Sequence, residues 1–293
     1  MKILLAGANG QLGRCVQDVF AVTDHTLVPF DRASLNIADA ITVDALVGQH
    51  QPDVIINAAA YTAVDKAESE PEVARQINVI GPANLAIAAT RHNALLLHIS
   101  TDYVFDGTKI EPYLESDATN PKGVYGQTKL DGEKKVQALC EKYVILRTAW
   151  VFSEYGNNFV KTMLRLGGEC EALQVVDDQI GCPTYAGDIA RACLAVCEAH
   201  QVGQARNGVY HYAGDRALSW YDFAGQVFAL AMAQGLLDKV PELSAISTAQ
   251  YPTPAERPAY SQLNSEKFAQ YYAFPASYWL AGLKQVVGVL AQR

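Results

Sequence analysis

The sequence predicts an α/β protein built on a Rossmann-type doubly wound parallel sheet, with a smaller C-terminal lobe interleaved with it. Three observations predict this fold. Strand-like and helix-like segments alternate through the first 150 residues, and a glycine-rich turn separates the first strand from the first helix. The strands are short, almost continuously apolar runs, as expected of parallel strands that are buried on both faces.

The first half alternates between five strands and four helices. The strands are expected at residues 2–6, 26–30, 53–57, 95–100 and 143–147. The first helix follows from the apolar spacing of Leu12, Val16 and Phe20, and further helices are expected at residues 38–50, 71–91 and 124–142. Right-handed crossovers between parallel strands leave only a few topologies for this order.

The second half has a less regular pattern. Strands are expected at residues 173–176 and 208–212, and helices at residues 158–166, 185–200 and 220–234. The loop at residues 247–258 contains three prolines, and no low-complexity linker separates the halves. We therefore expect a lobe interleaved with the sheet, and a ligand cleft between them at the carboxyl ends of the strands.

Composition excludes several classes of function. The chain has 293 residues and a net charge of −8, and it contains no run of basic residues that could bind nucleic acid. No apolar stretch reaches the roughly 18 residues of a membrane helix, and the first residues do not resemble a signal peptide. The six cysteines form no CxxC pair and no metal-ligand spacing, so we expect free thiols, no metal and a cytoplasmic location.

A dinucleotide site is predicted by the glycine-rich turn Gly7-Ala8-Asn9-Gly10-Gln11-Leu12-Gly13. Glycines allow a tight turn and a close approach of the backbone to a pyrophosphate, whose charge the amides of the following helix N-terminus bind. Glycine turns also serve packing, but this one lies between the first strand and the first helix, which favours the dinucleotide interpretation. We therefore assign residues 1–150 to a dinucleotide-binding domain and residues 151–293 mainly to a substrate-binding lobe.

The end of the second strand bears on the choice of cofactor. Asp31 is placed to accept hydrogen bonds from the adenosine ribose, which favours NADH. Arg32 follows directly and could pair with a 2′-phosphate, which favours NADPH, or it could be a solvated loop cation. The sequence leaves this choice open.

A proton-transfer site is predicted by Tyr125 and Lys129, which share one face of a helix one turn apart. The lysine is expected to favour the phenolate form of Tyr125 and to bind the nicotinamide ribose. A tyrosine and a lysine at this spacing also occur by chance on exposed helices. Thr101 supplies the context, because its hydroxyl lies at the carboxyl end of the fourth strand and can hydrogen-bond a substrate carbonyl oxygen beside Tyr125.

These motifs belong to a longer set that extends over nearly the whole chain. The others are Asp31-Arg32 with Leu35-Asn36-Ile37, the run Asn57-Ala58-Ala59-Ala60-Tyr61-Thr62 to Glu68, Ser100-Thr101-Asp102-Tyr103-Val104-Phe105-Asp106-Gly107, Arg147-Thr148-Ala149-Trp150, Gly156-Asn157-Asn158-Phe159, Asp178-Gln179 to Pro183-Thr184, and Arg257-Pro258 with Ser261 and Leu263-Asn264. With this set the chain resembles the extended short-chain dehydrogenase/reductase family, in the branch that acts on nucleotide sugars.

The resemblance implies an activity. It implies reduction of the C4 keto group of dTDP-4-dehydro-L-rhamnose, a dTDP-linked 4-keto-6-deoxysugar, to dTDP-L-rhamnose for cell-surface polysaccharide synthesis. NADPH, or alternatively NADH, would be the hydride donor.

The resemblance also implies roles for individual residues. It assigns Gly10, Gln11 and Leu12 to the cofactor pyrophosphate, Asn36 and Ile37 to the adenine, Ala60, Tyr61 and Thr62 to the middle of the cofactor, Thr101, Tyr125 and Lys129 to the chemistry, Asp102, Tyr103 and Trp150 to the sugar, and Asn158 and Arg257 to the substrate diphosphate.

One departure from the family pattern concerns metal. Some members hold magnesium through glutamates at a dimer interface, and the matching positions here are Cys15 and Gly187. Neither residue has a carboxylate, so we expect no metal at this place, and the chain could be a monomer or a homodimer.

Two other functions remain as alternatives. A nucleotide-sugar epimerase or dehydratase would share the fold, but a dehydratase needs a second carboxylate beside Asp102, where this chain has Tyr103. A non-catalytic regulatory subunit, similar to the beta subunit of methionine adenosyltransferase, would also share the fold. The presence of Thr101, Tyr125 and Lys129 argues for catalysis.

Overall fold

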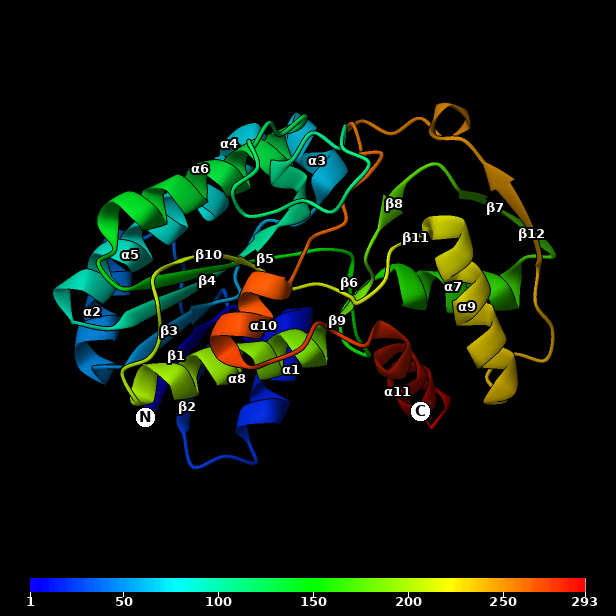
Figure 1. Ribbon diagram of the computed structural model, residues 1–293. Coiled ribbons are helices and arrows are strands. Elements are labelled where there is room, and N and C mark those ends of the chain that lie inside the picture. The colour runs from blue at the N-terminus through cyan, green and yellow to red at the C-terminus, as the bar shows by residue number, and fades with distance from the viewer. Residues whose placement is uncertain (293) are drawn as a thin grey trace.

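A six-stranded parallel sheet forms the centre of the computed structural model, which describes residues 1–292 (Figure 1). The strand order is β2-β1-β3-β4-β5-β10, with β1 Lys2–Ala6, β2 Thr26–Phe30, β3 Val54–Asn57, β4 Leu95–Thr101, β5 Tyr143–Thr148 and β10 Gly208–His211. Chain order reverses between β1 and β3, and doubly wound sheets hold their ligands at such a switch point. The predicted doubly wound parallel sheet is confirmed.

Helices cover both faces of the sheet (Figure 1). One face packs against α1 Gln11–Phe20 and α8 Ala186–Gln201, and the other against α2 Ala40–His50, α5 Gly81–Arg91 and α6 Val124–Leu139. Alternate residues of one strand serve the two faces, because successive side chains of a strand point in opposite directions. Ile3 and Leu5 thus join the first cluster, and Leu4 joins the second.

The segment before α5 differs from the prediction of one uninterrupted helix over residues 71–91. It contains α4 Pro71–Arg75 and then the π-helical turn η1 Gln76–Ile80, and it follows α3 Val64–Ser69, which was not predicted. The wider turn places Asn78 so that its side chain accepts a hydrogen bond from the Tyr61 amide at 2.9 Å and donates to Thr128 Oγ1 at 3.2 Å. Such π turns are frequent near functional sites. Through Asn78, this one links the segments around Tyr61 and Thr128, and both segments border the cavity described below.

The second half of the chain contributes to both parts of the molecule. β10 extends the sheet beside β5, and α8 packs beside α1. The rest forms a smaller lobe from α7 Phe159–Glu169, α9 Trp220–Ala233, α11 Trp279–Ala291 and the parallel pair β7 Ala172–Val176 and β12 Glu242–Ile246 (Figure 1). Its core is rich in aromatic side chains, including Phe152, Tyr185, Phe223 and Trp279. The assignment of this lobe to substrate binding stays a prediction.

Short elements connect these parts. They are η2 Asp102–Val104, β6 Val151–Phe152, β8 Ile180–Gly181, β9 Thr184–Tyr185, β11 Leu218–Ser219, η3 Thr248–Gln250 and α10 Glu266–Tyr272. Within residues 1–292, no helix combines the length and the apolar character that crossing a lipid bilayer would need.

The packing of the glycine turn can be tested with Gly13→Ala. A Cβ atom at Gly13 would lie 2.2 Å from the carbonyl oxygen of Gly7 and 2.8 Å from Ala8 Cα, so the backbone of the turn would have to move. We expect the free energy of unfolding to fall by about 1–3 kcal/mol in a urea titration.

The matched control is Gly225→Ala on α9, where an added Cβ meets no atom within 4 Å. Since alanine favours a helix over glycine by about 1 kcal/mol, this variant should be slightly more stable than the parent. Equal effects of the two substitutions would contradict the close packing at Gly13.

Candidate active site

A cavity of about 590 Å³ lies at the carboxyl ends of the central strands. Twelve of the residues predicted for the site line it: Gly10, Gln11, Leu12, Ala60, Thr62, Thr101, Asp102, Tyr103, Tyr125, Lys129, Trp150 and Asn158. They come from segments as far apart in sequence as the glycine turn and the start of α7. The parallel sheet brings these segments together because its strand ends meet at one edge.

The glycine turn forms one wall of the cavity. Gly7 has φ +88°, and a Cβ there would lie 2.6 Å from the Ala59 amide nitrogen, so β1 and β3 approach too closely for any side chain. Gly10 is the N-cap of α1, and no side chain caps this helix. The first amides of α1 are therefore free to bind an anion. Gly7 and Gly13 shape the turn but do not line the cavity.

Asp31 and Arg32, the two residues that bear on cofactor choice, differ in their contacts. Asp31 accepts hydrogen bonds from the Ser34 amide and hydroxyl at 2.9 and 2.8 Å and from Asn9 Nδ2 at 2.9 Å. These bonds, those of Ser34 first, hold the pKa of the Asp31 carboxyl below its usual value. Arg32 is exposed and makes no ion pair or hydrogen bond with any residue between 1 and 292.

Only some of the other residues predicted to bind the cofactor line the cavity. Ala60 and Thr62 line the cavity, whereas Asn36, Ile37 and Tyr61 do not. Ile37 is buried against Gly81 at the start of α5, where an added Cβ would lie 2.4 Å from its side chain. The Tyr61 hydroxyl donates to Glu70 at 2.8 Å, away from the cavity lining.

The structure brings together Thr101, Tyr125 and Lys129, the residues predicted to take part in proton transfer. Thr101 ends β4, and Tyr125 lies in the first turn of α6, one turn before Lys129. Lys129 is only 2% exposed, and its Nζ donates to the carbonyl oxygen of Ile99 at 2.7 Å. Burial lowers the pKa of Lys129 to about 8, and the negative charge of Glu133 opposes this effect.

The structure corrects the predicted state of the Tyr125 phenol. We expected Lys129 to favour the phenolate, but burial raises the pKa of Tyr125 well above its usual value, and a hydrogen bond with Thr101 opposes this only in part. The reason is desolvation, which disfavours the charged form, and the negative charge of Asp102 acts in the same direction. The Lys129 ammonium is directed to the carbonyl oxygen of Ile99. Tyr125 is therefore held as a protonated phenol, the form that can donate a proton.

Asp102 and Tyr103 begin the short helix η2 beside this group. Asp102 is 2% exposed; its Oδ1 accepts a hydrogen bond from Thr101, and its Oδ2 has no hydrogen-bond partner within residues 1–292. The Tyr103 hydroxyl accepts a hydrogen bond from Arg257 at 2.9 Å, and Arg257 also pairs with Asp65 at 2.6 Å. Arg257 does not line the cavity itself, so its contact with the site is through Tyr103.

Trp150 and Asn158 bring the small lobe to the cavity. Trp150 has φ +46°, which is strained for a residue other than glycine, and its ring stacks on Trp220 with 3.4 Å between ring centroids. The Asn158 side chain caps the N-terminus of α7 by accepting a hydrogen bond from the Lys161 amide, and it donates to Gln11 Oε1 at 2.9 Å. The lobe is thus hydrogen-bonded to the glycine turn.

Several lining residues were not predicted to belong to the site. They are Asn9, Ala58, Val64, Ile99, Ser100, Thr148, Val151, Gly156 and Asn157. Four of them directly precede or follow a predicted residue and the other five lie two positions from one, so closeness to a strand end or to a predicted residue was the available signal. Thr148 shows this best, because it ends β5 in register with Thr101 at the end of β4.

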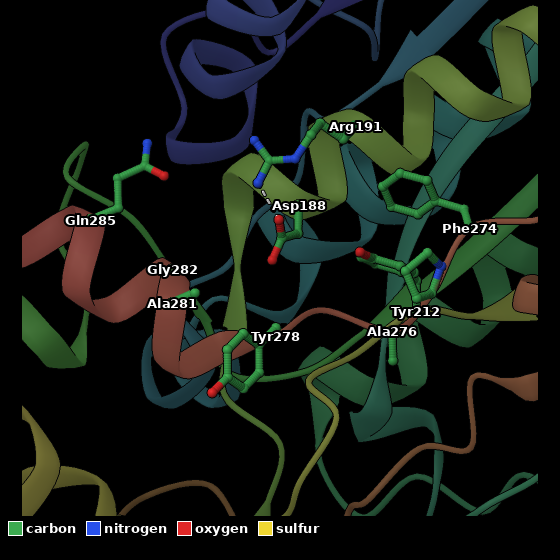
Figure 2. Close-up of a pocket in the computed structure, with 10 residues that line it drawn as sticks. Asp188, Arg191, Tyr212, Phe274, Ala276, Tyr278, Ala281, Gly282 and Gln285 are labelled. Carbon is green, nitrogen blue, oxygen red and sulfur yellow. Dashed lines mark hydrogen bonds and ion pairs between the residues drawn. The ribbon is translucent and has the colours of Figure 1, made fainter.

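A second cavity, of about 320 Å³, lies between α8 and α11 and holds none of the predicted site residues (Figure 2). Arg191 and Asp188 form an ion pair on its α8 side, and Tyr278 and Gln285 stand on its α11 side (Figure 2). Within the described residues, no group of three or more histidine, cysteine, aspartate or glutamate side chains is placed to hold a metal ion. Cys15 is buried between α1 and α8, and Gly187 packs against the Tyr185 ring.

The similarity to known proteins extends over nearly the full length of the chain. A family model described as the RmlD substrate binding domain matches residues 1–291. The chain belongs to this family. A dTDP-4-dehydrorhamnose reductase of Aggregatibacter actinomycetemcomitans is 46% identical over 97% of this chain and 98% of the relative.

Solved structures agree with this membership. A dTDP-4-dehydrorhamnose reductase of Clostridium acetobutylicum is 42% identical, covers 99% of both chains and superposes with a TM-score of 0.92. One from Bacillus anthracis, solved in complex with NADP, is 37% identical with a TM-score of 0.88 and covers 97% of this chain and 98% of its own.

The buried carboxyl of Asp102 leads to a pH-dependent prediction. Burial raises the pKa of Asp102 to about 6, above its ordinary value of 3.8. Between these values the folded protein holds a proton that the unfolded chain has released, so stability falls as pH rises from about 4 to about 6. Asp102→Asn lacks this titration, and from pH 4 to pH 8 its stability should improve relative to the parent by roughly 1–3 kcal/mol.

Guanidinium unfolding of both proteins at pH 4, 6 and 8 measures this difference. A stability difference that did not change with pH would show that the Asp102 carboxyl titrates normally.

Proposed function

We propose that this protein is an NADPH-dependent reductase that converts the C4 keto group of dTDP-4-dehydro-L-rhamnose to the hydroxyl of dTDP-L-rhamnose. The observation that carries the proposal is the cavity itself, in which the free amides of the α1 N-terminus face the same space as Thr101, Tyr125 and Lys129. The reductases of Aggregatibacter, Clostridium and Bacillus, similar along nearly their whole length, support the choice of substrate.

The residues of the cavity fit a dinucleotide. Close approach at Gly7 and Gly13 leaves backbone amides in place of side chains along the wall that would face the pyrophosphate. When bound, the reduced nicotinamide supplies the hydride for the carbonyl carbon. Lys129 is buried beside the cavity, where its ammonium can hold ribose hydroxyls.

Tyr125 provides the proton that the developing alkoxide needs. Its phenol is kept protonated by burial and has Thr101 as a hydrogen-bonding neighbour, so the two hydroxyls can bind one substrate oxygen between them. When the proton has moved, the phenolate is left near the Lys129 ammonium, which stabilises it. Tyr125 then regains a proton from solvent.

The cavity gives less support to the alternatives. A dehydratase needs a second acid–base residue beside Asp102, but the next side chain is Tyr103, which is bonded to Arg257. A regulatory subunit has no need for Thr101, Tyr125 and Lys129 to line one cavity. An epimerase would retain its nicotinamide through turnover, so tightly bound NAD in the purified protein would favour that function.

We propose that NADPH is preferred over NADH. Asp31 is already engaged by Ser34, Ala33 and Asn9, whereas the exposed Arg32 is available for a 2′-phosphate. The Bacillus anthracis reductase was solved with NADP. We also place the reaction in the cytoplasm, since the six cysteines are free thiols and five of them are buried.

Tyr125→Phe tests the proton donor. We expect kcat to fall by about 10²–10⁴-fold while the dissociation constant of NADPH stays nearly unchanged, because the ring is kept and only the hydroxyl is lost. Turnover is followed by the absorbance of reduced nicotinamide with dTDP-4-dehydro-L-rhamnose as substrate.

The matched control is Tyr143→Phe, at the opposite end of β5 from the cavity, which should keep parental turnover. Parental turnover by Tyr125→Phe would end the assignment of Tyr125 as the donor.

Arg32→Ala tests cofactor preference. Loss of a charge-assisted contact with phosphate should weaken NADPH binding by at least about tenfold, and NADH binding should be unaffected. Fluorescence titration of the variant with each cofactor gives both constants. Equal weakening for the two cofactors would argue against a 2′-phosphate contact.

A further inference from the structure

A buried ion pair lies directly behind the cavity, and the reaction as described does not use it. Glu133 on α6 is 1% exposed and Arg147 on β5 is 4% exposed. Arg147 donates to both carboxylate oxygens of Glu133, from Nε at 2.9 Å and from Nη2 at 2.7 Å. The Ser100 hydroxyl donates to Glu133 Oε1 at 2.5 Å. Burying two charges in this way is costly, and it contributes little to stability unless the geometry is good.

The pair joins the three elements that carry the proposed reacting groups. Glu133 lies one helical turn after Lys129 and two turns after Tyr125, on the same face of α6. Ser100 directly precedes Thr101 on β4, and Arg147 directly precedes Thr148 on β5. One carboxylate therefore holds α6 against the ends of both strands.

The same carboxylate acts on the charge of Lys129. Burial disfavours the ammonium of Lys129, and Glu133 is the charged group that opposes this effect. The imidazoles near the pair contribute no positive charge at neutral pH, because burial lowers the pKa of His98 well below its usual value and that of His211 to about 3. Asp102 and Tyr103, from η2, face Tyr125. Arg147, from β5, is held by Glu133, and its charge is not among those that shift the pKa of Lys129.

We propose that Glu133, fixed by Arg147 and Ser100, is a positioning residue that sets the place of the Tyr125–Lys129 pair relative to Thr101 and keeps Lys129 in its charged form. The proposal rests on the function proposed above for Tyr125 and Lys129. Glu133 touches neither cofactor nor substrate, since it does not line the cavity. It acts through Lys129.

Glu133→Gln removes the charge and keeps nearly the same shape. The titration midpoint of Lys129, about 8 in the parent, should fall by at least about one pH unit. It can be followed without substrate by NMR of protein that carries ¹³Cε-labelled lysine, with the Lys129 signal identified by its loss in Lys129→Met. The alkaline limb of the pH profile of kcat should move down by the same amount.

A structural role alone would give a different result. Glu133→Gln would then lower the melting temperature, while the Lys129 midpoint and the alkaline limb stayed where they are in the parent; that outcome overturns the proposal. Asp44→Asn is the control, because it removes a carboxylate on α2 that is paired with Arg91 and is not among the charges that act on Lys129. Asp44→Asn should change neither the titration midpoint of Lys129 nor the alkaline limb of the pH profile of kcat.

A second variant keeps the test decisive if Glu133→Gln folds poorly. The double substitution Glu133→Gln with Arg147→Met removes both charges, which relieves the unpaired buried guanidinium. The Lys129 midpoint should remain lowered in this variant, because the neighbouring negative charge is still absent. A return of the midpoint to about 8 would attribute the effect to the unpaired Arg147 and overturn the proposal.

These measurements separate the two proposals. If the parent protein does not reduce the keto sugar, the proposed function fails. The titration of Lys129 without substrate still decides whether Glu133 keeps Lys129 charged.

Discussion

The parallel direction of all six central strands is the constraint on which the rest of the structure depends. Because the strands run the same way, the residues that follow β1, β3, β4 and β5 meet at one edge of the sheet. The glycine turn, the alanine run after Asn57, Thr101 and Thr148 all reach the cavity for this single reason. The helices between the strands fill both faces with apolar side chains, which leaves this edge as the place for polar groups.

The polar groups at this edge are held at a cost to stability. Lys129, Asp102, Glu133 and Arg147 are all nearly fully buried, and each would be better solvated in the unfolded chain. The structure offsets the cost with specific partners: Ile99 O for Lys129, and the bidentate contact of Arg147 for Glu133. Asp102 Oδ2 is left without such a partner within residues 1–292. Proteins commonly retain strain and unmet polar groups of this kind where they bind ligands.

The sequence was sufficient for features with a local signal. Apolar runs marked the sheet strands, and glycine spacing together with strand ends located the Gly10 turn, Thr101 and the Tyr125–Lys129 helix face. Features that depend on distant partners were not predictable. The π turn at Asn78 exists through contacts with Tyr61 and Thr128, and the Trp150–Trp220 stack joins residues 70 positions apart. The raised pKa of the Tyr125 phenol was not predictable for the same reason, since it follows from burial, which sequence spacing does not reveal.

The side chain of Asn158 has a consequence for how the two parts of the molecule are held together. Its oxygen accepts a hydrogen bond from the Lys161 amide at the N-terminus of α7. Its nitrogen donates to the side chain of Gln11, the first residue of α1. Gln11 Nε2 in turn donates to the carbonyl oxygen of Val151, and Ser153 donates to Gln11 Oε1. The Gln11 side chain thus joins the glycine turn to Val151, Ser153 and Asn158 at the start of the small lobe through three hydrogen bonds. Separating the small lobe from the glycine turn would therefore require all three hydrogen bonds of this one side chain to break.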